Sequence, residues 1–312
     1  MWLGALIFLV GIGLVLWGAE RFTDGALATA RRFRLSPFFV GALASGFEPE
    51  QLVTGVAAAV GGLPQVALGT VIGATVFLLT AGLGLALLIV PMDVNIPKAG
   101  VLAMWVVLLP FAFALLNDGT VSRSEGVLLG LVSGGLLGWL YRRSPVLIPA
   151  DEDAPIEPGG SSRLKALGLL TLGIAALVAG AELVVRGAST LISSLGISET
   201  FFGMVVVAMG ESLEETARMV APARRGHPEL AWGNVVGTVI MLLAFNLGVI
   251  ALAKPVTAAP LVLRLHVPYL IGCALLVGAA LLTARRLGRA MGGVLVLLYL
   301  VYLALNLPHL RG

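Results

Sequence analysis

Two stretches of this chain place glutamates inside long runs of apolar residues. They cover residues 41–84 and 203–248, and the acids they hold are Glu48, Glu50, Glu211, Glu214 and Glu215. A charged carboxylate at the centre of a bilayer costs roughly 3 kcal/mol or more, so such a residue normally faces a bundle interior or a water-filled cavity and has a functional role. Hard cations prefer oxygen ligands, and carboxylates supply both oxygen and charge. The two stretches therefore predict one cation site near the middle of a membrane.

The two stretches share a pattern that would shape such a site. Each has an acid-bearing turn, an apolar run, a Gly-x-Pro element and a Gly-x-x-x-Gly sequence that opens the next helix. Pro49 disfavours helix at the residue before it, so we expect a break there that frees backbone carbonyls as ligands. The paired glycines, at 69 and 73 and again at 233 and 237, would let helices approach closely.

The composition is that of a helical membrane protein. Of the 312 residues, 58% are apolar and only 12% are charged, with a mean hydropathy of +1.01. A soluble domain carries about 25% charged residues. Apolar stretches long enough to cross a bilayer recur throughout, and the first, at 2–20, is interpreted as a spanning helix rather than a signal peptide. The lone Cys273 excludes a disulfide framework within the chain.

We expect ten membrane-spanning segments. They are predicted at 2–20, 37–60, 66–90, 99–116, 125–141, 164–184, 200–221, 229–253, 265–284 and 290–307. They form a first five-helix repeat over residues 1–141 and a second over residues 164–312. A cytoplasmic linker at 142–163, rich in acid, Pro and Gly, joins the two and is expected to be disordered.

The two halves repeat each other at a nearly constant spacing. The tripeptide Gly-Ala-Glu at 18–20 recurs 162 residues later at 180–182, and Glu50 matches Glu215 at a spacing of 165. Because each half holds an odd number of spans, the second half would be inserted upside down relative to the first. Transporters with such inverted repeats bind their ions at the midplane, on interrupted helices. The expected fold is an all-α integral membrane protein of two inverted five-helix repeats.

The basic residues predict the orientation. If the amino terminus lies outside, fourteen of the twenty Lys and Arg residues are cytoplasmic, five are outside, and Arg218 falls within a span. Cytoplasmic loops carry an excess of Lys and Arg. We therefore expect both termini outside the cytoplasm, in a plasma (inner) membrane.

The acid-bearing turns resemble those of the cation/Ca2+ exchanger (CaCA) superfamily, which includes the Na+/Ca2+ and H+/Ca2+ antiporters. The second turn reads Gly-Glu-Ser-Leu-Glu-Glu at 210–215, followed by Gly-Asn-Val-Val-Gly-Thr at 233–238. The first reads Phe-Glu-Pro-Glu at 47–50, followed by Gly-Thr-Val-Ile-Gly-Ala at 69–74. The resemblance spans nearly the whole chain. It implies alternating access, in which the first and sixth spans slide across a core of spans 2, 3, 7 and 8.

The resemblance also implies roles for particular residues. Glu50 and Glu215 match the two central ion-binding glutamates of the family. The other candidate ligands either match neighbouring motif positions or are acids that this chain adds. They are Glu48, Glu211, Ser212, Glu214, Asn234 and Thr238.

Several positions depart from the family pattern. Leu78 and Leu242 stand where the family has Asn or Asp, and Ala74 replaces a liganding Ser. Arg218 lies within ion-pair reach of both acids at 214–215 on a helix, although it could instead extend to the cytoplasmic surface. The lost oxygens favour one divalent site, or one shared with protons, over several ion sites. Clustered carboxylates in a low-dielectric cavity cannot all stay ionised, which favours H+ over Na+ as the counter-ion.

We therefore expect a secondary active cation antiporter that exchanges Ca2+ or a similar divalent cation for H+ or Na+. It is expected to be no enzyme, to need no cofactor and no nucleic acid, and to act as a monomer in the lipid bilayer. A second hypothesis is a nontransporting scaffold or sensor with a decayed ion site. The two leucines favour this hypothesis, whereas the retained and added acids oppose it. The glutamates could also be neutral packing residues, since burial favours a protonated carboxyl.

Overall fold

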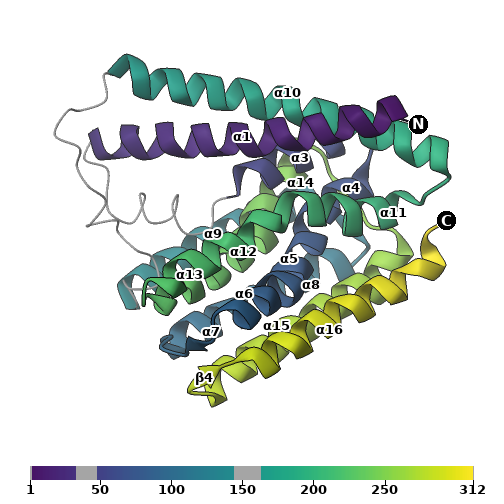
Figure 1. The fold of residues 1–312 in the computed structure, drawn as a ribbon. Helices are drawn as coiled ribbons and strands as arrows, with labels where there is room; N and C mark the ends of the chain where they lie inside the picture. Colours follow the sequence, from purple (N-terminus) through teal and green to yellow (C-terminus); the bar gives the residue numbers. More distant parts are fainter. Residues whose placement is uncertain (1, 33–47, 144–162, 312) are drawn as a thin grey trace.

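A computed structural model describes residues 2–32, 48–143 and 163–311, and apart from four two-residue strands the regular structure in these ranges is helical (Figure 1). Seven helical segments of the described ranges are long and apolar enough to cross a membrane. They are Trp2–Gly25, Pro64–Ile89, Lys98–Leu116, Leu167–Leu195, Pro228–Ala253, Val262–Thr283 and Arg289–His309. The expectation of an all-helical membrane protein is thereby confirmed.

Three of the ten expected spans are not among these seven. The span expected at 37–60 begins outside the described residues, and its described part is α3 (Pro49–Val60). The span expected at 200–221 corresponds mainly to α12 (Ala208–Arg224), which carries three glutamates and two arginines. The third, expected at 125–141, lies within α9 (Arg123–Arg143). The linker expected at 142–163 lies almost wholly outside the described residues.

Two central rods hold the core. The first runs from Pro64 to Ile89 through α4 (Pro64–Leu68), η1 (Gly69–Gly73), α5 (Ala74–Phe77), η2 (Leu78–Gly82) and α6 (Leu83–Ile89). The second runs through α13 (Pro228–Ile240), η5 (Met241–Asn246) and α14 (Leu247–Ala253). In their most apolar windows 83% and 78% of the residues are buried, against 50% or less in the other five candidate spans. The η segments are π-helical turns, which often occur at functional sites.

Glycine allows the first rod to cross a segment of the second half at very short range. Gly69 faces Gly203 in the π-helical η4 (Phe202–Val207), which follows the single turn α11 (Glu199–Phe201) and leads into α12. A Cβ on Gly69 would lie 2.2 Å from the carbonyl of Gly203, and one on Gly203 would lie 2.5 Å from the carbonyl oxygen of Gln65. No side chain fits between two backbones this close, so the close approach expected at Gly69 is observed.

Helices α1 (Trp2–Arg32) and α10 (Arg163–Leu195) form a separate layer and lie side by side across the top of Figure 1. They run antiparallel, since contacts pair early positions of α1 with late positions of α10. The contact is made by glycines at intervals of seven residues, which are Gly4, Gly11 and Gly18 on α1 and Gly173, Gly180 and Gly187 on α10. A Cβ on any of these six would come within 3 Å of the opposite helix, so small residues are required at this contact.

The remaining helices pack around the rods, and two short strand pairs join the halves. These helices are α7 (Lys98–Val106), α8 (Leu108–Leu116), α9, η6 (Val262–His266), α15 (Val267–Thr283), α16 (Arg289–Asn306) and the 3-10 turn η7 (Leu307–His309). Strand β1 (Met92–Asp93) pairs antiparallel with β4 (Arg286–Leu287), and β2 (Thr120–Val121) pairs antiparallel with β3 (Val256–Thr257). Each pair takes one strand from each half of the chain.

Glu199 adds a further link between the halves. Its carboxylate accepts hydrogen bonds from the backbone N–H groups of Gln65 at 2.6 Å and Val66 at 3.4 Å, in the first turn of α4. An acid is favourable at a helix N-terminus, where N–H groups lack partners within the helix. Partial burial raises the pKa of the Glu199 carboxyl, and the two N–H groups oppose this rise.

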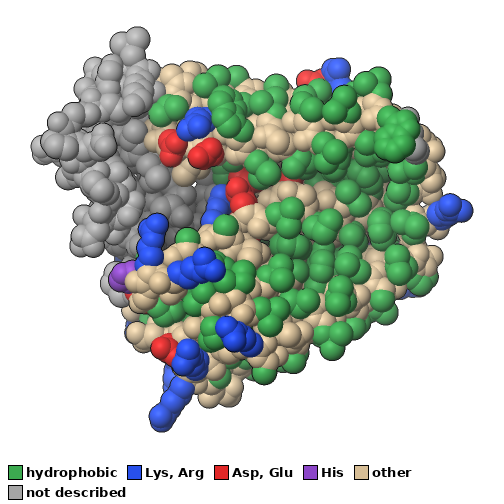
Figure 2. Space-filling model, in the orientation of Figure 1, with side chains coloured by type: hydrophobic (Ala, Val, Ile, Leu, Met, Phe, Trp, Pro, Cys, Tyr) green, Lys and Arg blue, Asp and Glu red, His purple; other side chains and the backbone are tan. Residues whose placement is uncertain are grey.

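The surface is apolar in the middle and charged at the ends. Figure 2 shows hydrophobic side chains over most of one face, with basic side chains gathered near the end where α13 begins and where β4 lies. Many large apolar side chains are exposed, among them Leu109, Leu131 and Leu297. A surface of this kind is stable when lipid covers it, as expected for a membrane protein.

Candidate cation site

The site is built where α3 meets α12 and the second rod. Glu48 occupies the N-cap position of α3 without a capping hydrogen bond from its side chain, Pro49 begins the helix, and Glu50 lies in its first turn. Pro is well suited to the first helical position because its missing N–H would have no partner there. Glu48 is itself not helical, as expected for the residue before a proline. The Glu48 carbonyl is not free, however, since it accepts hydrogen bonds from Leu52 N–H at 3.0 Å and from the Asn246 amide at 3.4 Å.

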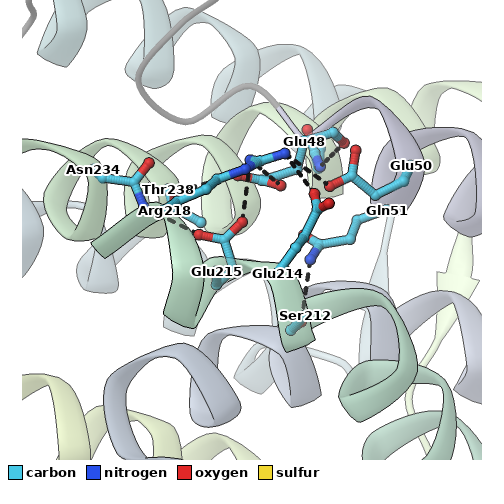
Figure 3. A network of polar contacts seen from close by, with 10 residues as sticks. Glu48, Glu50, Gln51, Ser212, Glu214, Glu215, Arg218, Asn234 and Thr238 are labelled. Carbon is cyan, nitrogen blue, oxygen red and sulfur yellow. Dashed lines mark hydrogen bonds and ion pairs between the residues drawn. The ribbon is translucent and has the colours of Figure 1, made fainter. Parts of the chain in front are cut away.

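Four carboxylates from two helices converge at this point (Figure 3). Each of Glu48, Glu50, Glu214 and Glu215 offers one oxygen that lies within 4.8 Å of the oxygens of the other three. The side chains of Glu48 and Glu50 are fully buried, that of Glu215 is 1% exposed, and that of Glu214 is 34% exposed. The expected proximity of Glu50 and Glu215 is thus observed. We refer to these four residues as the carboxylate cluster.

Arg218 extends into the carboxylate cluster and contacts all four acids. Its Nη1 donates to both oxygens of Glu48, at 2.9 and 3.0 Å, and to Glu215 Oε1 at 3.2 Å. Its Nη2 donates to Glu214 Oε1 at 2.5 Å and lies 3.8 Å from Glu50 Oε1. From the sequence, the Arg218 side chain could either pair with the acids at 214–215 or extend to the cytoplasmic surface. The structure shows the pairing. Its pairing also reaches Glu48 and Glu50, beyond its own helix.

Two side chains of the second rod complete the cluster. The amide of Asn234 donates to Glu215 Oε2 at 3.1 Å, and the hydroxyl of Thr238 donates to Glu48 Oε1 at 3.4 Å. Both residues lie on α13, one helical turn apart, so a single face of this helix supports acids from α12 and α3. The structure therefore brings Asn234 and Thr238 to the cluster, where the sequence placed them.

Ser212 and Glu211 lie on α12 but are not among the four acids of the cluster. The hydroxyl of Ser212 accepts a hydrogen bond from the amide of Gln51 at 3.2 Å. Glu211 is fully buried, and neither of its oxygens has a hydrogen-bond partner among the described residues. The Thr54 hydroxyl and the Gln51 amide oxygen are also buried without a partner in the described part of the chain. Glu211 is therefore outside the group of four, although it is buried on the same helix.

Gln51 and Asn246 were not among the residues predicted from the sequence. Gln51 directly follows Glu50, and Asn246 interrupts the otherwise apolar run Leu242–Leu247. Both are buried amides that contact residues of the site. The signal that could have identified them is a polar side chain inside a membrane-spanning segment, because such residues face the interior and need partners.

The cluster is suited to hold a single hard cation. Ca2+ takes six to eight oxygens at about 2.3–2.6 Å, so oxygens on opposite sides of the ion lie roughly 4.6–5.2 Å apart. The oxygens of the cluster span 4.8 Å, which matches this requirement. Two positions within the π-helical turns η2 and η5 supply no oxygen, since Leu78 and Leu242 are buried apolar residues.

Apolar helices long enough to cross a membrane, which enclose a cluster of acids, are typical of polytopic membrane ion transporters, and this chain has both features. Within this class, the chain belongs to the sodium/calcium exchanger protein family, whose model matches residues 3–141 and 165–307. As a member of an exchanger family it is a secondary transporter and not an enzyme, as its sequence predicted.

Two relatives and one solved structure show how much of the chain is similar to known proteins. An uncharacterized membrane protein of Methanocaldococcus jannaschii is 30% identical over 76% of this chain and 77% of its own length. The sodium/calcium exchanger MaX1 of Methanosarcina acetivorans is 25% identical over 96% of this chain and 97% of its own. The solved structure of the sodium-calcium exchanger NCX_Mj, soaked with Na+ and Sr2+, superimposes with a TM-score of 0.64 at 28% identity and covers 97% of this chain and 98% of that one.

Proposed function

We propose that this protein is an antiporter that exchanges Ca2+ or a similar divalent cation for H+ by alternating access. The observation that carries the proposal is the carboxylate cluster, in which acids from both halves meet within 4.8 Å. Glu48, Glu50, Glu214 and Glu215 would bind the ion, while Asn234 and Thr238 would hold two of these acids in place. A divalent ion offsets the charge of several carboxylates at once, which suits a cluster of this density.

The missing oxygens favour H+ over Na+ as the counter-ion. Several Na+ sites would need several sets of fixed oxygens, and two positions that could supply them are the buried Leu78 and Leu242. Carboxylates this close interact strongly, so their affinity for protons is a property of the whole cluster and not of single residues. Protons need no coordination cage, which makes them compatible with the residues that remain.

The family match also supports a finer architecture of ten spans in two inverted repeats. Each strand pair joins a strand of one half to a strand of the other, and exchanging the halves converts the β1–β4 pair into the β3–β2 pair. The antiparallel packing of α1 on α10, the first long helix of each half, obeys the same symmetry. In this arrangement both termini would lie outside the cytoplasm of a plasma membrane.

A second candidate function is a nontransporting scaffold or sensor that keeps the exchanger fold. One specific observation favours it: the Arg218 guanidinium lies where a cation would bind and pairs with all four acids. In that case Arg218 would permanently neutralise the cluster, and no ion would enter. The retention of four acids, where one would suffice to pair with an arginine, argues against this function.

Ion flux in proteoliposomes tests the proposal and separates the two functions. The purified chain would be reconstituted with internal Ca2+, Mn2+ or Mg2+, and pH and Na+ gradients would be applied one at a time. We expect divalent efflux that follows the pH gradient without Na+. Efflux that follows a Na+ gradient at clamped pH, and ignores a pH gradient, would show that the counter-ion is Na+. The absence of flux under every gradient would favour the scaffold.

A further inference from the structure

Arg218 has the geometry of a bound ligand of the carboxylate cluster. Its two terminal nitrogens share four acids, and every contact is 3.8 Å or shorter. Guanidinium is planar, always charged and presents five N–H donors, so it can pair with several carboxylates at once. The fully buried Glu48 and Glu50, from the other half of the chain, face it across the cluster.

The side chain reaches the cluster from a more accessible place. The Arg218 side chain is 36% exposed, whereas three of its four partners are 1% exposed or less. The backbone that carries it lies one helical turn beyond Glu214 and Glu215 on α12. An arginine has a long, flexible stem, so its head can move several ångströms while the helix stays in place. Arg218 can therefore withdraw toward the exposed edge without unfolding any element.

The cluster has room for one cation at a time. A divalent ion needs the cluster oxygens at about 2.3–2.6 Å, and these are the atoms to which the guanidinium donates. Two like charges within about 4 Å repel strongly in a site of low dielectric constant. An empty cluster is also unfavourable, because buried carboxylates without a counter-charge are costly. The cluster is therefore stable with either the guanidinium or an ion, but not with both.

We propose that Arg218 is a tethered cation that fills the ion site whenever no transported ion is bound, and that a divalent ion binds by displacing it. This inference depends on the proposed function, because it requires that an ion does enter the cluster. Arg218 then sets the affinity of the site, since each ion must compete with a cation that is always at hand. This competition lowers the affinity that the carboxylates alone would have for the ion, so that the bound ion can also dissociate.

Divalent binding to Arg218 variants tests this proposal. Mn2+ binding to the purified full chain would be measured by calorimetry for wild type, Arg218→Gln, Arg218→Lys and Arg224→Gln. Arg224 is an exposed residue of the same helix, so its loss removes the same charge without emptying the cluster. We expect at least about tenfold tighter binding in Arg218→Gln, because the ion no longer has to displace a cation that occupies the cluster. Arg224→Gln should stay close to wild type, and Arg218→Lys should lie between wild type and Arg218→Gln.

Competition between free guanidinium and Mn2+ provides a second measurement. If Arg218 had only a structural role, free guanidinium would not compete with Mn2+ in any variant. In Arg218→Ala the cluster should admit the free ion, so millimolar guanidinium should weaken Mn2+ binding competitively. Wild type already holds its own guanidinium and should respond much less. Thermal melting of each variant in detergent would establish that it is folded.

The outcomes distinguish this inference from the proposed function. If wild type binds Mn2+ while a folded Arg218→Gln binds it equally or less tightly, Arg218 is a structural pair and the inference is wrong. If none of the variants binds any divalent ion, the proposed function fails and the inference fails with it. Binding by Arg218→Gln alone would show that Arg218 permanently excludes the ion from wild type, and would overturn both the displacement and the proposed function.

Discussion

Glu50 and Glu215 are both buried, yet their surroundings differ. Glu215 accepts hydrogen bonds from Arg218 at 3.2 Å and from Asn234 at 3.1 Å. Neither oxygen of Glu50 accepts a hydrogen bond among the described residues, and its ion pair with Arg218 is the longest in the cluster at 3.8 Å. A buried carboxylate without partners is costly. Glu50 is therefore the acid of the cluster with the most to gain from a bound cation.

Replacement of either central acid by Gln should abolish divalent flux. Glu50→Gln and Glu215→Gln keep the shape of the side chain and remove the charge that offsets the dehydration of a divalent ion. The measurement is flux in proteoliposomes, with melting in detergent to show that the protein is folded. Glu182→Gln is a matched control, because Glu182 is exposed on α10 and pairs only with Arg186 among the described residues. Full flux in both cluster variants would refute the assignment of these acids.

At the residue scale, the sequence predicted the contacts within helices better than those between them. The spacing of Arg218 from Glu214 and Glu215 placed it within reach of both, because residues three and four apart share a helix face. The pairing of Arg218 with Glu48 joins residues 170 positions apart. That contact depends on how α3 docks on α12, which no local spacing encodes.

The elements around the site are held by glycine contacts that a single methyl group would disturb. Gly11 on α1 packs against the backbone of α10, and a Cβ there would lie 2.7 Å from the nitrogen of Val184. Gly180 on α10 packs in the same way, with its added Cβ 2.7 Å from the nitrogen of Val15. Backbone atoms cannot move aside as a side-chain end can, so the two helices would have to separate.

Gly11→Ala and Gly180→Ala should therefore lower the melting temperature and impair flux, while Gly13→Ala should do neither. Gly13 lies on the exposed face of α1 with nothing within 4 Å of its added Cβ. Alanine there should be neutral or slightly stabilising, since Gly in a helix interior costs about 0.5–1 kcal/mol relative to Ala. The measurement is melting in detergent followed by flux. Equal behaviour of Gly11→Ala and Gly13→Ala would contradict the close packing of α1 on α10.

At the element scale, proline and glycine made helix starts and crossings predictable. Pro49, Pro64 and Pro228 each begin a helix, and Gly69 lies at the tightest crossing. The π-helical turns were not predictable, because one extra residue in an apolar segment leaves no mark when every face is buried. Because every face of the rods is buried, hydropathy predicted where these segments begin and end but not the direction in which each side chain points.

For the whole molecule, the basic residues predict which loops face the cytoplasm. Arg225 lies in a loop expected to be cytoplasmic, and Lys254 lies in one expected to be outside. Both side chains are exposed, and the single native thiol, Cys273, is buried. Engineered cysteines can therefore be labelled without interference.

Labelling of intact cells tests this orientation. We expect a membrane-impermeant maleimide to modify Lys254→Cys in intact cells and to modify Arg225→Cys only after permeabilisation. The unmodified chain, with Cys273 alone, controls for background. Modification in the opposite order would reverse the orientation, while modification of both positions in intact cells would contradict the proposed number of spans between them.

The central claim is that the carboxylate cluster binds the transported cation, and anomalous diffraction from crystals soaked in Mn2+ tests it most directly. We predict one strong peak within coordination distance of Glu50 and Glu215, with the Arg218 side chain moved out of the cluster. The same crystals without Mn2+ should show Arg218 paired with the acids. A protein that transports Mn2+, yet shows its peak elsewhere or keeps Arg218 among four unliganded carboxylates, would contradict the account.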